Sequence, residues 1–216
     1  VITGAGTGMG RETARLLAQY GATVVLVGRN RDTLAGIETA IRDGGGTAHA
    51  KPCDITDPAA VQQLIDWVHT ELGTIDVLIN NAGSNCAVMN PMYLPEDQLH
   101  AVLDTNLVSV FRLVRLVLPG MVERGGGTIL TVSSLAAVNP GLLGGAAYGA
   151  AKAGVRNFMT FLHSTFRSDG IRAITVDSDE LNAVAHMVQP GNRVDLMLAM
   201  QREEGGQTVV PFMDRM

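Results

Sequence analysis

The chain has 216 residues, of which 46% are hydrophobic and 17% charged, and its formal net charge is −5. This composition predicts a packed globular protein rather than a disordered chain, and the acidic balance without a lysine and arginine cluster argues against nucleic acid as a partner. No apolar run is long enough to span a membrane. Two cysteines and five scattered histidines form no metal-ligand pattern, so we expect a cytoplasmic protein without a metal.

In chain order, short strands rich in β-branched residues alternate with longer amphipathic helices. Asp57 and Pro58 are typical of a helix start, and Gly21 is typical of a helix end. The alternation predicts one domain, residues 1–216, built as a doubly wound parallel sheet between two layers of helices, the three-layer Rossmann-like α/β/α arrangement. The predicted strands are 1–2, 23–27, 47–51, 75–80, 127–133 and 171–176, and the predicted helices are 8–20, 31–43, 58–72, 96–121, 148–167 and 178–189.

The first strand leads into TGAGTGMG, residues 3–10, in which every second residue is a glycine. The spacing excludes the dinucleotide fingerprint G-x-G-x-x-G, and the P-loop is excluded because no Lys-Ser or Lys-Thr follows. The stretch fits T-G-x-x-x-G-x-G instead. A glycine turn that ends a strand and opens a helix favours a pyrophosphate, because free backbone N–H groups and the helix dipole attract it. We therefore predict a bound dinucleotide, against the alternative of a turn that binds nothing.

Four further motifs follow in order: NNAG (80–83), TN (105–106), VSS (132–134) and YGAAK (148–152). Together with the glycine stretch they resemble, in order and approximate spacing, the short-chain dehydrogenase/reductase family in its shorter, single-domain branch. The resemblance covers residues 1 to about 176. It implies an oxidoreductase that interconverts a hydroxyl and a carbonyl group with a nicotinamide cofactor.

Tyr148 and Lys152 stand four apart on a predicted helix, so their side chains share one face. A tyrosine has an ordinary pKa of about 10 and a neighbouring cation lowers it, so Tyr148 is the predicted general acid/base and Lys152 the cation. The resemblance implies that Ser134 binds the substrate oxygen, although it precedes the tyrosine by one residue more than is usual in the family, and Ser133 is the alternative. It also implies that Asn106 links a water to the lysine.

The end of the second strand indicates the choice of cofactor. Where NAD-specific members carry an acidic residue, this chain has Gly28 and Arg29, and a guanidinium favours the 2′-phosphate of NADP. We predict NADPH, with NAD as the less favoured cofactor and a solvated, uninvolved Arg29 as the alternative. By resemblance Asp54, with Ile55 beside it, contacts adenine. The implied cofactor-binding residues are Gly4, Gly6, Thr7, Gly8, Met9, Gly10, Arg29, Asp54, Ile55, Asn81, Ala82, Gly83, Tyr148 and Lys152.

The predicted substrate pocket is lined by residues 84–94 and by Leu142 and Leu143, which are mostly apolar or small. This lining indicates a modestly hydrophobic alcohol or ketone, such as a lipid or a steroid-like molecule. A different class of function is a catalytically silent relative that binds the dinucleotide as a sensor or structural partner. The intact set of four predicted catalytic residues favours the enzyme.

Two expectations concern helices in the second half of the chain. Residues 99–118 and 155–166 carry apolar side chains over more than one face, which predicts a homodimer or homotetramer. Family members continue after the sixth strand with Pro-Gly and a flexible segment of about twenty residues over the substrate. Here the strand runs directly into the predicted helix with Ser178 as N-cap. We therefore expect that a substrate loop is missing from the sequence at or near Asp177–Ser178.

Overall fold

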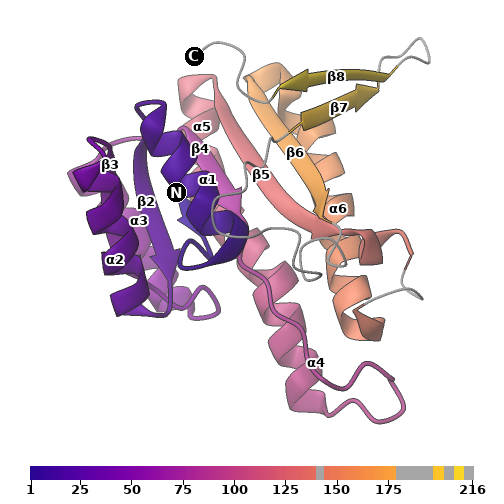
Figure 1. Cartoon of the computed structure of the whole chain (residues 1–216). Coiled ribbons are helices and arrows are strands. Elements are labelled where there is room, and N and C mark those ends of the chain that lie inside the picture. The colour runs from indigo at the N-terminus through magenta and orange to yellow at the C-terminus, as the bar shows by residue number, and fades with distance from the viewer. Residues whose placement is uncertain (140–143, 179–196, 202–206, 212–216) are drawn as a thin grey trace. The chain divides into compact units, whose positions relative to one another are not determined.

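The structure is a computed structural model and describes residues 1–139, 144–178, 197–201 and 207–211. Residues 1–177 form one compact unit and residues 178–216 a second. The first unit is built on a six-stranded sheet (Figure 1). The second contains an antiparallel pair, β7 (Met197–Gln201) and β8 (Gln207–Pro211), which the sequence analysis does not predict. Since each unit is described by itself, the prediction of one domain over residues 1–216 stays a prediction.

The strand order β3-β2-β1-β4-β5-β6 is that of a doubly wound sheet, so the predicted fold class is confirmed. β1 pairs in parallel with β2 on one side and with β4 on the other. The chain therefore adds strands on one side of β1 as far as β3 and then on the opposite side from β4 onward, so the strand order reverses between β1 and β4. Ligands of such sheets bind beyond the carboxyl ends of the strands at this reversal. The strands are β1 (Ile2–Thr3), β2 (Thr23–Gly28), β3 (Thr47–Pro52), β4 (Val77–Asn80), β5 (Gly127–Ser134) and β6 (Ile171–Ser178).

Helices cover both faces of the sheet, which explains why the central strands are apolar without alternation. α1 (Gly8–Gln19) and α2 (Arg31–Asp43) pack together on one face. The other face carries α3 (Pro58–Glu71), α5 (Ser109–Arg124) and α6 (Gly145–Phe166), whose buried side chains form one core cluster with those of the strands. The three-layer arrangement is visible in Figure 1.

The helix predicted over residues 96–121 has an interruption. It consists of α4 (Glu96–Leu103), a π-helical turn (Asp104–Val108) and α5, which ends before Gly125 at a φ of 73°. A π-turn inserts one extra residue into a helix and is often found at functional sites. The turn contains Asn106, one of the predicted catalytic residues.

β6 is longer than predicted: it extends two residues beyond its predicted end, so that Ser178, the predicted N-cap, is the last residue of the strand. The rest of the predicted helix, residues 179–189, lies outside the described residues, as do Leu142 and Leu143. The missing substrate loop stays a prediction. So does the cytoplasmic location; in the described part of the chain no helix has the length and apolar character needed to cross a membrane.

The start of α3 provides a test of how local signals stabilise the fold. The Asp57 carboxylate accepts hydrogen bonds from the backbone N–H groups of Ala59 (2.8 Å) and Ala60 (3.3 Å). We expect Asp57→Ala to lower the free energy of unfolding by about 1 kcal/mol in urea denaturation, because these N–H groups lose their acceptor. Asp43→Ala is the matched control, since Asp43 is exposed at the end of α2, where the helix dipole disfavours a carboxylate. Equal losses in both variants would contradict the assigned cap.

Candidate active site

Two of the four glycines in residues 3–10 are needed for packing inside the protein. Gly4 has a φ of 65°, and a Cβ there would lie 2.9 Å from the Cα of Ala82. A Cβ at Gly10 would collide with the carbonyl oxygen of Gly4 and with the Asn81 amide. These glycines therefore allow the start of α1 to pack closely against the end of β4. All four glycines are predicted to bind the cofactor, but at Gly4 and Gly10 the close packing alone is enough to explain why a glycine is present.

The other two glycines leave the backbone bare. A Cβ at Gly8 would meet no described atom within 4 Å, and at Gly6 the nearest atom would be a Thr33 methyl at 3.6 Å. Thr7 precedes α1 without making a side-chain cap, and Thr7, Gly8 and Met9 are exposed. The first-turn N–H groups of α1 are thus left for water or a bound anion. An uncapped helix start of this kind is a general anion-binding feature of proteins.

Hydrogen bonds join the ends of β1 and β4 at the point where the strand order reverses. The Thr3 hydroxyl accepts from the backbone N–H groups of Asn81 (3.0 Å) and Ala82 (3.1 Å) and donates to Ile79. The Asn81 amide donates to the carbonyl oxygens of Thr3 (3.0 Å) and Gly4 (3.2 Å). Asn81 therefore braces the ends of β1 and β4 against each other. The sequence analysis misses Thr3, although its place as first residue of the glycine stretch is a usable signal.

Arg29 and Asp54 follow the carboxyl ends of the neighbouring strands β2 and β3. The Asp54 carboxylate accepts hydrogen bonds from the backbone N–H (2.9 Å) and hydroxyl (2.7 Å) of Thr56. These bonds, and to a smaller extent the Arg29 guanidinium, hold the pKa of Asp54 below its usual value. Ile55 is buried, and its carbonyl oxygen accepts from Arg112 at 2.8 Å. The structure thus places Asp54, which is predicted to contact adenine, near the exposed guanidinium of Arg29.

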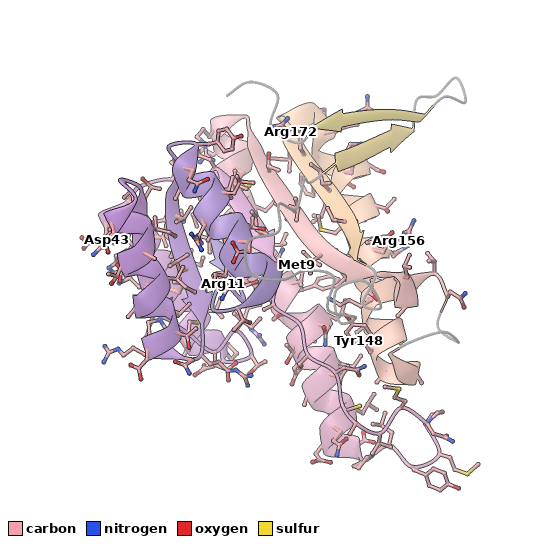
Figure 2. The ribbon with its side chains drawn as sticks, in the orientation of Figure 1. Met9, Arg11, Asp43, Tyr148, Arg156 and Arg172 are labelled. Atoms are coloured by element: carbon pink, nitrogen blue, oxygen red, sulfur yellow. The ribbon has the colours of Figure 1, made fainter. Side chains whose placement is uncertain are left out.

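Tyr148 and Lys152 lie near the start of α6, where Figure 2 labels Tyr148, with Arg156 further along the same helix. Both residues are buried: Tyr148 is 6% exposed and Lys152 is 4% exposed. The Lys152 ammonium donates to the carbonyl oxygen of Val132 at 2.9 Å and stands 5.5 Å from the centroid of the Tyr148 ring. The spacing of four residues therefore places the Tyr148 ring and the Lys152 ammonium on one face of α6.

Asn106 is fully buried on the π-turn and binds the backbone that follows β4. Its amide nitrogen donates to the carbonyl oxygens of Ser84 (2.6 Å) and Val102 (2.8 Å), and its oxygen accepts from the Ser84 N–H at 3.3 Å. A Cβ at Gly83 would lie 3.0 Å from that oxygen and 3.4 Å from the Lys152 ammonium nitrogen. Gly83 thus separates Asn106 from Lys152, and the absence of a side chain there leaves room for both.

Ser134 is buried at the end of β5. Its hydroxyl oxygen accepts from the backbone N–H of Ala136 at 3.1 Å and caps a short 3-10 helix (Leu135–Ala137), on which α6 packs. The hydroxyl of Ser133 donates to the carbonyl oxygen of Lys152 at 3.4 Å. The two serines therefore differ in their backbone partners: the Ser133 hydroxyl donates to α6, whereas the Ser134 hydroxyl accepts from the turn that follows β5.

Part of the predicted pocket lining, residues 84–94, lies beside Tyr148. Cys86 and Leu94 pack against a buried cluster that includes the tyrosine. Met89, Met92 and Tyr93 are 52%, 78% and 69% exposed, respectively. The segment therefore presents apolar side chains next to the residue predicted to transfer the proton.

Comparison with known proteins identifies the family. A family model described as short chain dehydrogenase matches residues 1–190. The chain belongs to the short-chain dehydrogenase/reductase family. It is similar to 7α-hydroxysteroid dehydrogenase of Escherichia coli (strain K12), with 36% identity over 189 residues that cover 85% of this chain and 73% of the relative. The family identification and the enzyme class predicted from sequence, an oxidoreductase of hydroxyl and carbonyl groups, are confirmed.

Two solved structures of short-chain dehydrogenases/reductases resemble this fold at 34% identity. One is a metagenomic short-chain oxidoreductase in complex with NADP, with a TM-score of 0.78 over 82% of this chain and 79% of the other. The second is a 7α-hydroxysteroid dehydrogenase complexed with NADH and 7-oxo glycochenodeoxycholic acid, with a TM-score of 0.76 over 82% and 68%. Relatives in this family thus bind either form of the nicotinamide dinucleotide.

The packing role of Gly10 leads to a direct test. We expect Gly10→Ala to lower the free energy of unfolding by about 1–3 kcal/mol, because its methyl group would overlap the Gly4 carbonyl oxygen. Gly36→Ala is the matched control, since Gly36 is an exposed glycine of α2 with open space around it, and it should raise that free energy by about 0.5–1 kcal/mol. Urea denaturation measures both. A stable Gly10→Ala variant would refute the packing role.

Proposed function

We propose that the protein is an NADP-dependent oxidoreductase that interconverts a hydroxyl and a carbonyl group on a modestly hydrophobic small molecule. Tyr148 is the general acid/base. The observation that carries the proposal is the buried Lys152 ammonium, which lies 5.5 Å from the centroid of the Tyr148 ring. A cation at this site favours the phenolate and so brings a tyrosine into the range of acid–base chemistry.

The residues around the strand ends fit a dinucleotide. The bare backbone of Gly6–Gly8 and the uncapped start of α1 suit a pyrophosphate, while Gly4 and Gly10 let that turn pack closely. Arg29 would bind a 2′-phosphate, and Asp54 with Ile55 would contact adenine. The remaining cofactor contacts come from Met9, from Asn81, Ala82 and Gly83 beside the ribose, and from Lys152. When bound, the nicotinamide donates or accepts the hydride.

The proton is handled by the chain's own side chains. In reduction, the Tyr148 hydroxyl gives its proton to the carbonyl oxygen, and in oxidation the phenolate takes it from the alcohol. Ser134 donates a hydrogen bond to the same substrate oxygen and so orients it. Asn106 links a water to Lys152, and its bonds to Ser84 and Val102 hold it in place for this role.

A steroid-like or lipid substrate is supported by two observations. Cys86 and Leu94 pack against the buried Tyr148 cluster, and the same segment exposes Met89, Met92 and Tyr93. The Escherichia coli relative is named as a hydroxysteroid dehydrogenase. The experiment is NADPH oxidation with a ketone panel that begins with 7-oxo glycochenodeoxycholic acid, alongside NADPH fluorescence titration. Binding without turnover on the whole panel would favour the silent relative.

Removal of the phenol hydroxyl tests the proposed acid/base. We expect Tyr148→Phe to lower kcat/KM by about 10²-fold or more with little change in the dissociation constant of NADPH, because only proton transfer is lost. Lys152→Ala should weaken both turnover and NADPH binding. Tyr20→Phe is the matched control and should behave as wild type, since Tyr20 is 62% exposed at the end of α1. Near-normal turnover in Tyr148→Phe would refute the mechanism.

The preference for NADP is tested at Arg29. A charge-assisted contact contributes about 1.5–3 kcal/mol, so we expect NADPH to bind about tenfold or more tightly than NADH. Arg29→Ala should narrow this difference, whereas Arg172→Ala, which removes the same charge from an exposed position in β6, should preserve it. Titration of both dinucleotides measures the effect. Equal affinities in the wild-type protein would contradict the preference.

We also propose a homodimer or homotetramer formed through α5, α6 and the π-turn. Val108, Phe111 and Phe161 are 38%, 45% and 57% exposed, and Phe111 stacks on Phe158 with ring centroids 3.7 Å apart. We expect light scattering to show a dimer or tetramer at micromolar concentration, and Phe161→Glu to shift the mass toward the monomer. Tyr20→Glu is the control and should leave the mass unchanged. A monomeric wild-type protein would refute this proposal.

A further inference from the structure

The start of α6 depends on the segment that follows β4. Gly144 precedes the helix with a φ of 90° and provides no side-chain cap. The backbone N–H of Ala146, in the first turn, donates instead to the carbonyl oxygen of Met89 at 3.3 Å. The first-turn donors of a helix have no partner within the helix itself. The segment after β4 thus supplies a contact that a capping side chain supplies elsewhere.

The backbone of Gly144 is in contact with the ring of Tyr148. A Cβ at Gly144 would lie 2.6 Å from Cδ1 of that ring, so the ring rests directly against the glycine. The carbonyl oxygen of Gly144 accepts a hydrogen bond from Nδ2 of Asn85 at 2.9 Å. Oδ1 of Asn85 in turn accepts from the backbone N–H of Cys86 at 2.8 Å. The nitrogen and the oxygen of the Asn85 amide therefore both form hydrogen bonds, and these two bonds fix the orientation of the amide.

The segment that follows β4 is also hydrogen-bonded to Asn106 on the π-turn. The neighbouring residue Ser84 is bound through both its N–H and its carbonyl oxygen by the amide of Asn106. Residues 84–89 thus connect the π-turn to the start of α6, with Asn85 immediately after the first attachment point. A displacement of Asn85 would be transmitted to Gly144 and from there to the Tyr148 ring.

We propose that Asn85 is a positioning residue for Tyr148. Its hydrogen bond to Gly144 holds the first turn of α6, and the Tyr148 ring with it, at the separation from Lys152 that proton transfer requires. The inference rests on the proposed function, in which Tyr148 is the general acid/base. A displacement of a reacting group by about 1 Å is enough to lower a rate by about 10²-fold.

The first test compares kinetics in three variants of the full chain. Asn85→Ala removes the amide, Asn85→Asp keeps the shape and the acceptor for Cys86 but removes the donor to Gly144, and Asn157→Ala is the control at an exposed position of α6. NADPH and the first ketone of the panel that shows turnover are the probes. In both Asn85 variants we expect kcat to fall about tenfold or more, with the NADPH dissociation constant within about twofold of wild type. The apparent pKa of the pH–rate profile should rise, because Lys152 stabilises a displaced phenolate less well.

A second readout needs no substrate. Hydrogen–deuterium exchange at the backbone N–H groups of residues 145–148 should be faster in both Asn85 variants and unchanged in Asn157→Ala. Unchanged exchange, or an unchanged kcat and pH profile in Asn85→Ala and Asn85→Asp, would overturn the positioning role. If Tyr148→Phe is inactive in the same assay, such a result leaves the proposed function intact. Near-normal activity of Tyr148→Phe would instead overturn the proposed function.

Discussion

The Lys152 ammonium is almost completely buried, and its need for polar partners constrains the positions of the elements around it. A buried charge costs several kcal/mol unless hydrogen bonds and polar groups replace its hydration. Here the carbonyl oxygen of Val132, 2.9 Å from the ammonium nitrogen, replaces one water, and the face of the Tyr148 ring lies 5.5 Å away. The end of β5 and the first turns of α6 must therefore keep a fixed separation. The small residues around Lys152 in α6 permit this approach.

The segment after β4 and the π-turn also leave room for the Lys152 ammonium. Gly83 stands between Lys152 and Asn106, and any side chain there would press on both polar groups. The π-turn directs Asn106 inward, where its amide bonds to Ser84 immediately after the NNAG motif. The hydrogen bonds of Thr3 and Asn81 then fix that motif to the end of β1. The glycine stretch and the π-turn are in this way connected through one set of hydrogen bonds across the sheet reversal.

Periodicity and motifs predict most of this arrangement. The buried run Val24–Val27 and the Asp57 cap are local signals, and the spacing of Tyr148 and Lys152 is sufficient to place them on one helix face. The π-turn is not predictable in this way. One added residue shifts the helical phase by about 100°, but in a helix that is apolar over more than one face this shift leaves no clear break in the pattern. The hydrogen bond from Asn85 to Gly144 joins residues 59 apart, and no local pattern encodes it. Which glycines are needed for packing and which leave the backbone bare also depends on neighbours distant in sequence, such as Asn81 beside Gly10.

In the proposed mechanism, Lys152 makes Tyr148 a stronger acid than an ordinary tyrosine. The chain has three tyrosines, and the other two, Tyr20 and Tyr93, are 62% and 69% exposed. The most direct measurement is a spectrophotometric titration of phenolate absorbance in the wild-type protein, Tyr148→Phe and Lys152→Met. We expect one tyrosine to ionise below the ordinary pKa of about 10. This component should be absent from Tyr148→Phe and should move to higher pH in Lys152→Met. Ionisation of all three tyrosines near the ordinary value, or a low component that persists in Tyr148→Phe, would contradict the proposed mechanism.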